Sequence, residues 1–248
     1  MVGYGTAIKL LSGFVNKLVG QFRQSEAGYT LKSLVSRARH HAQDIVRPIS
    51  YRKSNLKKLR QLYSDVSDIC PEAKIEVWSQ DEARLGLIPI LRRVWAPKGK
   101  RPVAIGKRRY QWVYLYGFVH PETGNTEWLI LPTVSLQAFE IALQHFAKAV
   151  GAGAQKRIIL VVDGAGWHKG KLKIPEGIHL LPLPAYSSEL QPAERLWPLV
   201  REALANKDID TLDELEELLV QRCCFLIDKT NVIKSNTLFH WWPSSKPN

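Results

Sequence analysis

A short β-branched run, Ile158–Val162, constrains the fold of this chain most strongly, because it ends directly in an acidic residue, Asp163. A run of this kind suits a central strand that is buried on both faces of a sheet. Asp81 stands just after a second strand-like segment, Lys74–Ser79, and Glu194 stands at the expected start of a helix. Three carboxylates therefore follow segments that are expected to be buried.

The elements around these acids predict a mixed α/β domain. Alternating aromatic residues in Gln111–Val119, followed by a Gly-Asn turn, predict an antiparallel hairpin. Apolar spacing predicts a helix over Leu136–Val150 and a strand over Ile178–Leu183. A further helix is expected after Thr211, which has capping-box spacing to Glu214.

The helix expected over Gln191–Asn206 carries two prolines. Pro192 suits the first turn, where no backbone donor is required. Pro198 should kink or loosen the first turns, because its ring opposes the carbonyl group of Glu194. Gln191 is also a poorer helix cap than asparagine. We therefore expect the turn that carries Glu194 to be less rigid than usual.

The positive charge of the chain, +12 in total, is concentrated in its first half. Residues 1–70 hold 12 Lys and Arg against 4 Asp and Glu, and residues 71–120 hold 10 against 4. Residues 121–248 hold 13 against 15. This asymmetry favours a polyanionic partner, usually nucleic acid. A positively charged but inert surface is the alternative.

The three cysteines and the apolar segments exclude several classes of protein. Two of the cysteines are adjacent and no CxxC motif occurs, so neither a disulfide framework nor a zinc site is indicated. No apolar run reaches the roughly 18–20 residues of a membrane span. We expect a protein of a reducing compartment, the cytoplasm, without membrane association.

Three regions follow from these patterns. Residues 1–70 predict a basic helical segment, in which a glycine turn separates two apolar stripes. This segment fits a helix-turn-helix remnant or an arm, and a helical appendage with a solvated basic face fits equally well. The α/β domain is expected over residues 72–230, and a C-terminal tail over 231–248.

The three acids indicate metal-dependent chemistry if they converge. Strand ends of one sheet lie about 4.8 Å apart, and converging carboxylates repel unless a cation neutralises them. Oxygen ligands of this kind favour Mg²⁺ or Mn²⁺. A pair of such ions can activate an attacking oxygen and stabilise a leaving one, which suits phosphodiester chemistry. Each acid taken alone is more often an exposed loop residue.

Five segments occur in order over about residues 75–205: QDEARLG, RVWAPKGKRP, YQWVYLYGFV, VVDGAGWHKG and AYSSELQPAERLW. In order and spacing they resemble the DDE transposases of bacterial insertion sequences, in the mariner-like branch. The resemblance implies a ribonuclease H-like fold, which is a mixed sheet with flanking helices. It places the catalytic, metal-binding acids at Asp81, Asp163 and Glu194.

The resemblance also implies a reaction and its partners. We expect two Mg²⁺ or Mn²⁺ ions, cleavage of DNA at the ends of an insertion sequence, and attack of the freed 3′-hydroxyl on a TA-containing target. A homodimer on double-stranded DNA, close to the bacterial nucleoid, is expected. The family's turn usually has proline at Ser188 and asparagine at Gln191, and its N-terminal region is longer. A catalytically impaired DNA-binding remnant and a ribonuclease H-like nuclease or resolvase are the alternatives.

Basic residues near the acids are the candidate DNA contacts. Arg84 belongs to the DEAR motif, and His168 matches a frequent family position. Glu82 adjoins Asp81 but should point to the opposite side of an extended segment. The tryptophans are expected in the core rather than as stacking platforms, including Trp95, Trp112 and Trp197. The candidate DNA contacts, for which solvated charges are the alternative, are Arg84, Lys98, Lys100, Arg101, Lys107, Arg108, Arg109 and His168.

Overall fold

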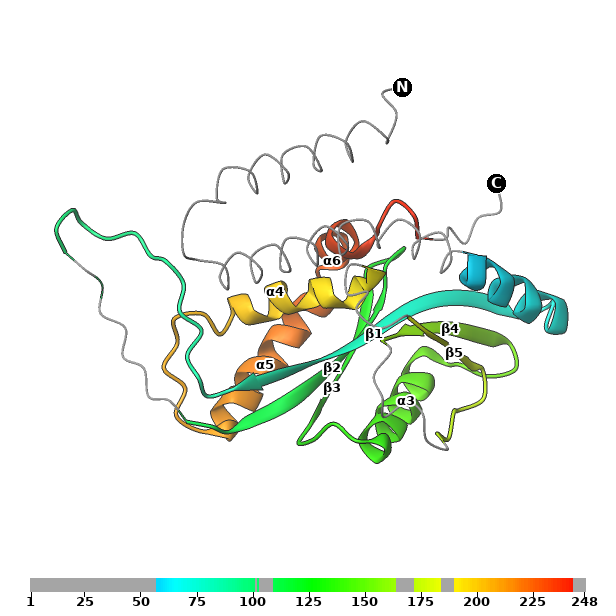
Figure 1. The fold of residues 1–248 in the computed structure, drawn as a ribbon, viewed down its shortest axis with the longest axis horizontal. Helices are drawn as coiled ribbons and strands as arrows, with labels where there is room; N and C mark the ends of the chain where they lie inside the picture. Colours follow the sequence, from blue (N-terminus) through cyan, green and yellow to red (C-terminus); the bar gives the residue numbers. More distant parts are fainter. Residues whose placement is uncertain (1–56, 101, 103–108, 164–171, 184–189, 243–248) are drawn as a thin grey trace, which may run out of the picture. The chain divides into compact units, whose positions relative to one another are not determined.

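A five-stranded mixed sheet forms the centre of the protein (Figure 1). The computed structural model describes residues 57–100, 102, 109–163, 172–183 and 190–242. The strands are β1 (Lys74–Gly86), β2 (Trp112–His120), β3 (Asn125–Leu131), β4 (Lys156–Val162) and β5 (Ile178–Pro182). Their order is β3-β2-β1-β4-β5, with β1 antiparallel to β2 and parallel to β4. This order, with helices on both faces, is ribonuclease H-like, so the predicted fold class is confirmed.

β1 is longer than the sequence predicts. It has 13 residues and continues past Ser79 through the polar residues Gln80, Asp81 and Glu82. The reason is that β2 pairs with β1 from Ser79 to Gly86, after β4 has paired with its first half. The expectation that Asp81 follows the end of a strand is therefore wrong, and this acid lies inside a central strand.

The two other predicted sheet segments agree with the structure. β2 and β3 form the expected antiparallel hairpin, and Gly124 in its turn has a φ of 80°. Glycine adopts this left-handed conformation at little cost. β4 is paired on both sides, with β1 and β5, as its continuous apolar sequence predicts.

One face of the sheet is covered by α3 (Leu136–Val150), whose bounds agree with the prediction. Ser135 caps the start of the helix with its hydroxyl, and Gly151 ends it in a left-handed conformation with a φ of 69°. Phe146 of this helix stacks on Phe118 of β2, with ring centroids 4.3 Å apart. These rings belong to the apolar cluster that joins α3 to the sheet.

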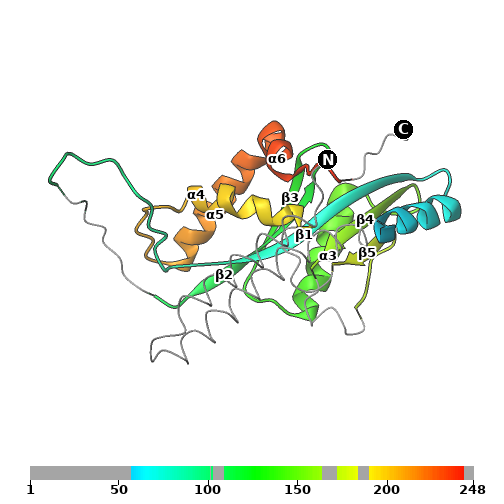
Figure 2. The ribbon, with the colours of Figure 1, turned by 45° about the horizontal axis from the view of Figure 1, so that its top comes forward.

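The opposite face carries the helical elements that follow β5 (Figure 2). Its elements are the 3₁₀ helix η3 (Pro192–Arg195) and the helices α4 (Leu196–Glu202), α5 (Leu212–Ile227) and α6 (Thr230–Thr237). Thr211 caps α5 as predicted, because its hydroxyl accepts a hydrogen bond from the Glu214 backbone. The Glu214 carboxylate accepts from the backbone of Asp210 instead of Thr211.

The helix predicted over Gln191–Asn206 is divided into η3 and α4. Pro198 lies in the first turn of α4 and has no N–H group to donate to the carbonyl of Glu194. The expected disturbance of the first turns is confirmed, and it takes the form of a 3₁₀ turn before a short α-helix. Glu194 lies within that 3₁₀ turn.

A helix over residues 57–69 precedes β1. Its Leu59 and Val66 are buried in a third apolar cluster, together with Val77 of β1 and Val161 of β4. The remainder of the predicted N-terminal segment, residues 1–56, lies outside the described residues. The end of the segment therefore packs on the same sheet as the α/β elements.

The C-terminal residues for which the sequence predicts a tail include α6. Ile233 of α6 is fully buried in the cluster beneath α4 and α5, and this burial explains why the segment is helical. Among the residues described, no helix combines the length and the apolar character that a membrane span requires.

Candidate active site

Asp81 and Asp163 lie on the same face of the sheet. The parallel register of β1 and β4 pairs Ser79 with Val161, and each acid stands two residues further along its own chain. Side chains two residues apart point to the same face of a strand, and adjacent strands are about 4.8 Å apart. Asp163 directly follows β4, and its charge raises the pKa of Asp81, so the two carboxylates lie near each other.

Glu194 approaches this face from η3, which packs against β1 through buried Pro192 and Ala193. Burial raises the pKa of Asp81 to about 7, and repulsion from Glu194 and Asp163 adds to this effect. Hydrogen bonds from the Trp197 side chain and the backbone at residue 82 oppose it. The three acids thus share one electrostatic environment, in which their charges are unfavourable together.

A buried polar contact ties η3 to β1. The side-chain carbonyl of Gln191 accepts a hydrogen bond from the Ser79 hydroxyl at 3.1 Å, and its amide group donates to the backbone carbonyl of Gln80. The Ser79 hydroxyl also accepts from the Ala193 backbone N–H at 3.3 Å. Ser79 and Gln191 are 0% and 2% exposed, so water does not compete for these bonds. This Ser79–Gln191 contact fixes the distance between η3 and β1.

Sequence reasoning missed the Ser79–Gln191 contact. Gln191 makes no side-chain hydrogen bond to its own helix, as expected for a poor cap. Its side-chain amide instead forms hydrogen bonds with the Ser79 hydroxyl and the Gln80 backbone carbonyl of β1. The available signal was the pair Ser79–Gln80, two polar residues that directly follow an apolar run. Polar groups inside a buried strand require partners, and here the partner is 112 residues away in sequence.

Trp197 of α4 contacts Asp81 directly. Its indole Nε1 donates a hydrogen bond to Oδ2 of Asp81 at 2.7 Å. Trp197 is 6% exposed, so the expectation that it lies in the core is confirmed. Gly117 of β2 is the residue paired with Asp81, and a Cβ atom there would lie 3.0 Å from the Trp197 ring. Glycine at this position therefore makes room for the indole.

Glu82 lies on the other face of β1, as the alternation of a strand requires. Gln80 donates a hydrogen bond to its carboxylate at 3.0 Å. Burial raises the pKa of Glu82 to about 8, and repulsion from Asp81 and Asp163 adds to the rise. Glu82 is therefore a further acid behind the three, on the side of the sheet that α3 covers, and its environment favours the neutral form.

The three acids supply the oxygen donors that a divalent metal ion prefers, but they do not form a closed cage. Within the described ranges, no group of three or more His, Cys, Asp or Glu side chains is arranged to hold one ion. Mg²⁺ commonly takes one or two protein carboxylates and completes its shell with water and phosphate oxygens. Repulsion from Glu194 and Asp163 contributes to the raised pKa of Asp81, and a bound cation would reduce this repulsion.

The candidate DNA contacts are dispersed. Arg84 is exposed and its guanidinium lies 5.0 Å from the ring centroid of Trp112. Arg109 is held by Asp210, through an ion pair of 3.1 Å and a hydrogen bond to the backbone carbonyl. Lys98 and Lys100 are exposed on the segment between β1 and β2. Arg101, Lys107, Arg108 and His168 lie outside the described residues.

Two of the tryptophans expected in the core are on the surface. Trp95 is 104% exposed and Trp112 is 39% exposed. Trp95 belongs to the segment between β1 and β2, whose described part runs away from the sheet (Figures 1 and 2). Trp112 stands at the first position of β2, where Arg84 covers one side of its ring. The prediction failed because aromatic character alone does not show whether a partner surface is available.

Comparison with known proteins identifies the segment that carries the site. The family model described as DDE superfamily endonuclease matches residues 76–216, a range that includes all three acids. The chain is 35% identical over 136 residues to the uncharacterized protein y4pE/y4sA of Sinorhizobium fredii (strain NBRC 101917 / NGR234). That alignment covers 52% of this chain and 96% of the relative.

Solved structures of Mos1 mariner transposase are similar to the chain at low sequence identity. The catalytic domain of Mos1 is 15% identical with a TM-score of 0.44, and the alignment covers 78% of this chain and 96% of that one. The mariner Mos1 paired end complex with Mg is 17% identical with a TM-score of 0.49, over 77% of this chain and 60% of that one. The chain thus spans about three fifths of the length of the transposase in that complex.

Proposed function

Because the chain belongs to the DDE superfamily endonuclease family, we propose that it is a transposase that cuts DNA at the ends of an insertion sequence and joins the cut end to target DNA. One observation carries the proposal. Asp81 and Asp163 are neighbours on one face of the sheet, and Glu194 lies close enough to raise the pKa of Asp81. The reaction is phosphodiester hydrolysis, followed by transesterification with the freed 3′-hydroxyl.

The proposed metal ligands are Asp81, Asp163 and Glu194. Together they would hold a pair of Mg²⁺ or Mn²⁺ ions. Bound ions of this kind activate the attacking oxygen of a phosphodiester reaction and stabilise the leaving one. The chain itself holds the carboxylates on β1, directly after β4, and in one 3₁₀ turn. The Ser79–Gln191 contact keeps η3 against β1, and Trp197 keeps one Asp81 oxygen in place.

The proposed partner is double-stranded DNA, both as the element ends and as a TA-containing target. The exposed Lys98 and Lys100, with Arg84 on the strand that carries Asp81, are its proposed backbone contacts. Arg109 would have to exchange its contacts with Asp210 for a phosphate. A homodimer assembled on DNA in the bacterial cytoplasm completes the proposal.

The test is strand cleavage by charge-removing variants. We expect Asp163→Asn and Glu194→Gln to bind DNA as the wild type does, but to cleave it at least about 100-fold more slowly with Mg²⁺ or Mn²⁺, since even a residue behind a metal ligand contributes about 10–100-fold. Glu217→Gln, which changes an exposed acid of α5, is the matched control and should cleave normally.

The products distinguish the proposed function from its alternatives. Joining of a pre-cut 3′ end to a second duplex indicates a transposase, whereas cleavage without joining indicates a nuclease or resolvase. Wild-type protein that binds DNA but cleaves none with either metal would indicate a catalytically impaired remnant. Normal cleavage by both acid variants would overturn the assignment of the site.

A further inference from the structure

We propose that Trp197 is a positioning residue for Asp81, and that its indole N–H holds one carboxylate oxygen so that the other is presented to a metal ion. This inference rests on the proposed function, because it assigns Asp81 to metal binding. It concerns a residue that contacts a carboxylate assigned to metal binding.

The hydrogen bond between Trp197 and Asp81 has the properties of a fixed support. The Nε1–Oδ2 distance of 2.7 Å is short for an N–H donor, as expected when the acceptor is charged. An indole has one donor and no acceptor, so it can only hold the Asp81 oxygen and cannot take a proton from it. The backbone at residue 82 also donates to the Asp81 carboxylate, so Trp197 is one of two donors that fix its orientation.

The Trp197 ring is closely packed, which restricts the movement of its donor. The backbone of Gly117 lies against it, and a Cβ atom there would be 3.0 Å from Cη2 of Trp197 and 3.1 Å from Cζ3 of Trp128. Trp128 also meets Trp197 edge to face, with ring centroids 6.4 Å apart. Trp128 is itself held by Thr126, to which its Nε1 donates at 2.9 Å.

The position of Trp197 in the chain couples two of the acids. It stands three residues after Glu194, about one helical turn away, on the continuous segment formed by η3 and α4. The segment that carries Glu194 therefore also donates a hydrogen bond to Asp81. A displacement of α4 would move both carboxylates, and this coupling distinguishes a positioning contact from a bond that merely satisfies a buried donor.

Trp128 supplies the matched control. Both rings contact the same Gly117, both belong to the cluster between the sheet and α4, and both donate one hydrogen bond. The acceptor of Trp128 is Thr126 and not an acid. Trp128→Phe therefore removes comparable volume and one hydrogen bond from the same cluster without touching Asp81 directly.

The experiment compares Trp197→Phe, Trp197 replaced by β-(3-benzothienyl)alanine, and Trp128→Phe. The benzothienyl ring keeps the shape of the indole but has sulfur in place of N–H, so it removes the donor with little loss of packing. Mn²⁺ affinity of the free protein is measured by electron paramagnetic resonance, together with thermal melting, DNA binding and strand cleavage.

We expect both changes at Trp197 to weaken Mn²⁺ binding and to slow cleavage by about 10–100-fold, the scale for residues that orient a ligand. DNA binding should be unchanged, and the benzothienyl variant should melt close to the wild type. Trp128→Phe should lower the melting temperature but weaken Mn²⁺ binding much less than either change at Trp197, because it keeps the indole donor to Asp81. Normal Mn²⁺ affinity in the benzothienyl variant, or an equal loss in Trp128→Phe, would overturn the proposal.

The Mn²⁺ measurement separates this inference from the proposed function. Wild-type protein that binds Mn²⁺ but cleaves no DNA contradicts the transposase assignment, while the effect of Trp197 on Mn²⁺ affinity still decides the inference. Wild-type protein that binds no Mn²⁺ at millimolar concentration overturns the inference as well, because Asp81 would then have no ion to be positioned for.

Discussion

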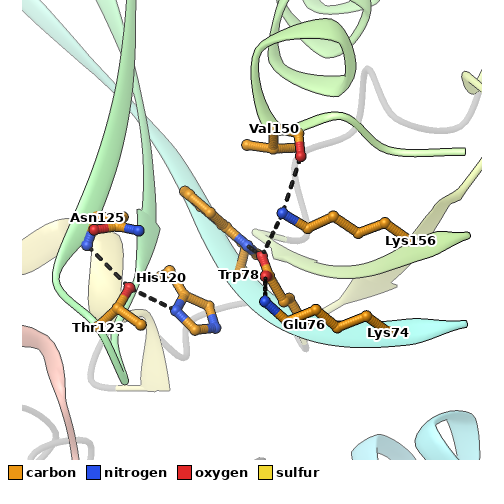
Figure 3. A network of polar contacts seen from close by, with 8 residues as sticks. All are labelled: Lys74, Glu76, Trp78, His120, Thr123, Asn125, Val150 and Lys156. Atoms are coloured by element: carbon orange, nitrogen blue, oxygen red, sulfur yellow. Dashed lines mark hydrogen bonds and ion pairs between the residues drawn. The ribbon is translucent and has the colours of Figure 1, made fainter.

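The two halves of β1 each bury a carboxylate that accepts a hydrogen bond from a tryptophan, but the electrostatic outcome is opposite. In the first half, Glu76 accepts from Trp78 at 2.9 Å and pairs with Lys74 at 2.8 Å and Lys156 at 3.1 Å (Figure 3). Burial alone would raise the pKa of Glu76, but these three donors lower it to about 2. In the second half, Asp81 has one tryptophan and two acidic neighbours, and its pKa rises to about 7.

This difference shows which acid is structural and which is available for chemistry. Glu76 is neutralised by the chain itself, so its charge is a stabilising part of the fold. The fold disfavours the charged form of Asp81, and likewise that of Glu82 on the opposite face. Buried groups whose pKa is raised by like charges are found preferentially at functional sites. The same strand thus separates a stabilised acid from a destabilised one.

The largest expected difference between variants of the two acids is in the free energy of unfolding without metal. At pH 8, Glu76→Gln should lower the free energy of unfolding by about 2 kcal/mol, because it leaves the partly buried Lys156 without its carboxylate. Asp81→Asn should leave it unchanged or higher, because asparagine can still accept the hydrogen bond from Trp197 but carries no repelled charge. Chemical denaturation with a chelator present measures both values.

The comparison between the two acids fails if Asp81→Asn destabilises the protein as much as Glu76→Gln does. That result would mean that the Asp81 charge is balanced within the fold. The two variants serve as controls for each other, since both replace a buried carboxylate of β1 by its amide and both retain a tryptophan donor.

Local patterns in the sequence predict the helices whose bounds depend on apolar spacing and on capping residues. The bounds of α3 follow from its apolar stripe, and α5 follows from the Thr211 capping position. Each pattern lies within a few residues of the element that it predicts. The fold class comes from the order of these elements together with the family motifs.

The site depends on contacts that such patterns do not contain. Hydropathy ends the predicted strand at Ser79, because the residues that follow are polar. In the structure the strand continues, since its backbone pairs with β2 and its polar side chains find partners in other parts of the chain. The Ser79–Gln191 contact and the Trp197–Asp81 bond join residues 112 and 116 positions apart. Trp95 is exposed for the converse reason: none of the described residues buries its aromatic side chain.

A smaller effect on the free energy of unfolding should appear at acidic pH. The pKa of Glu76 in the folded protein is lowered from 4.5 to about 2, so its stabilising contribution is complete above pH 4.5 and is lost as the pH falls towards 2. The contribution is about 1–2 kcal/mol, after allowance for screening of the exposed Lys74. The difference in unfolding free energy between the wild type and Glu76→Gln should therefore shrink across this pH range. A difference that stays constant down to pH 2 would contradict the assignment.

The smallest expected effect on stability is that of Ser79→Ala, at the boundary between the two halves of β1. Losing the bonds that Ser79 makes to Gln191 and Ala193 should cost about 1 kcal/mol of unfolding free energy. Because these bonds hold η3, and with it Glu194, cleavage should also slow by about 10-fold. Ser135→Ala, which removes the cap of α3 on the other face, should cost a similar 1 kcal/mol without slowing cleavage. Equal cleavage rates for the two variants would show that the Ser79–Gln191 contact stabilises the fold without placing Glu194.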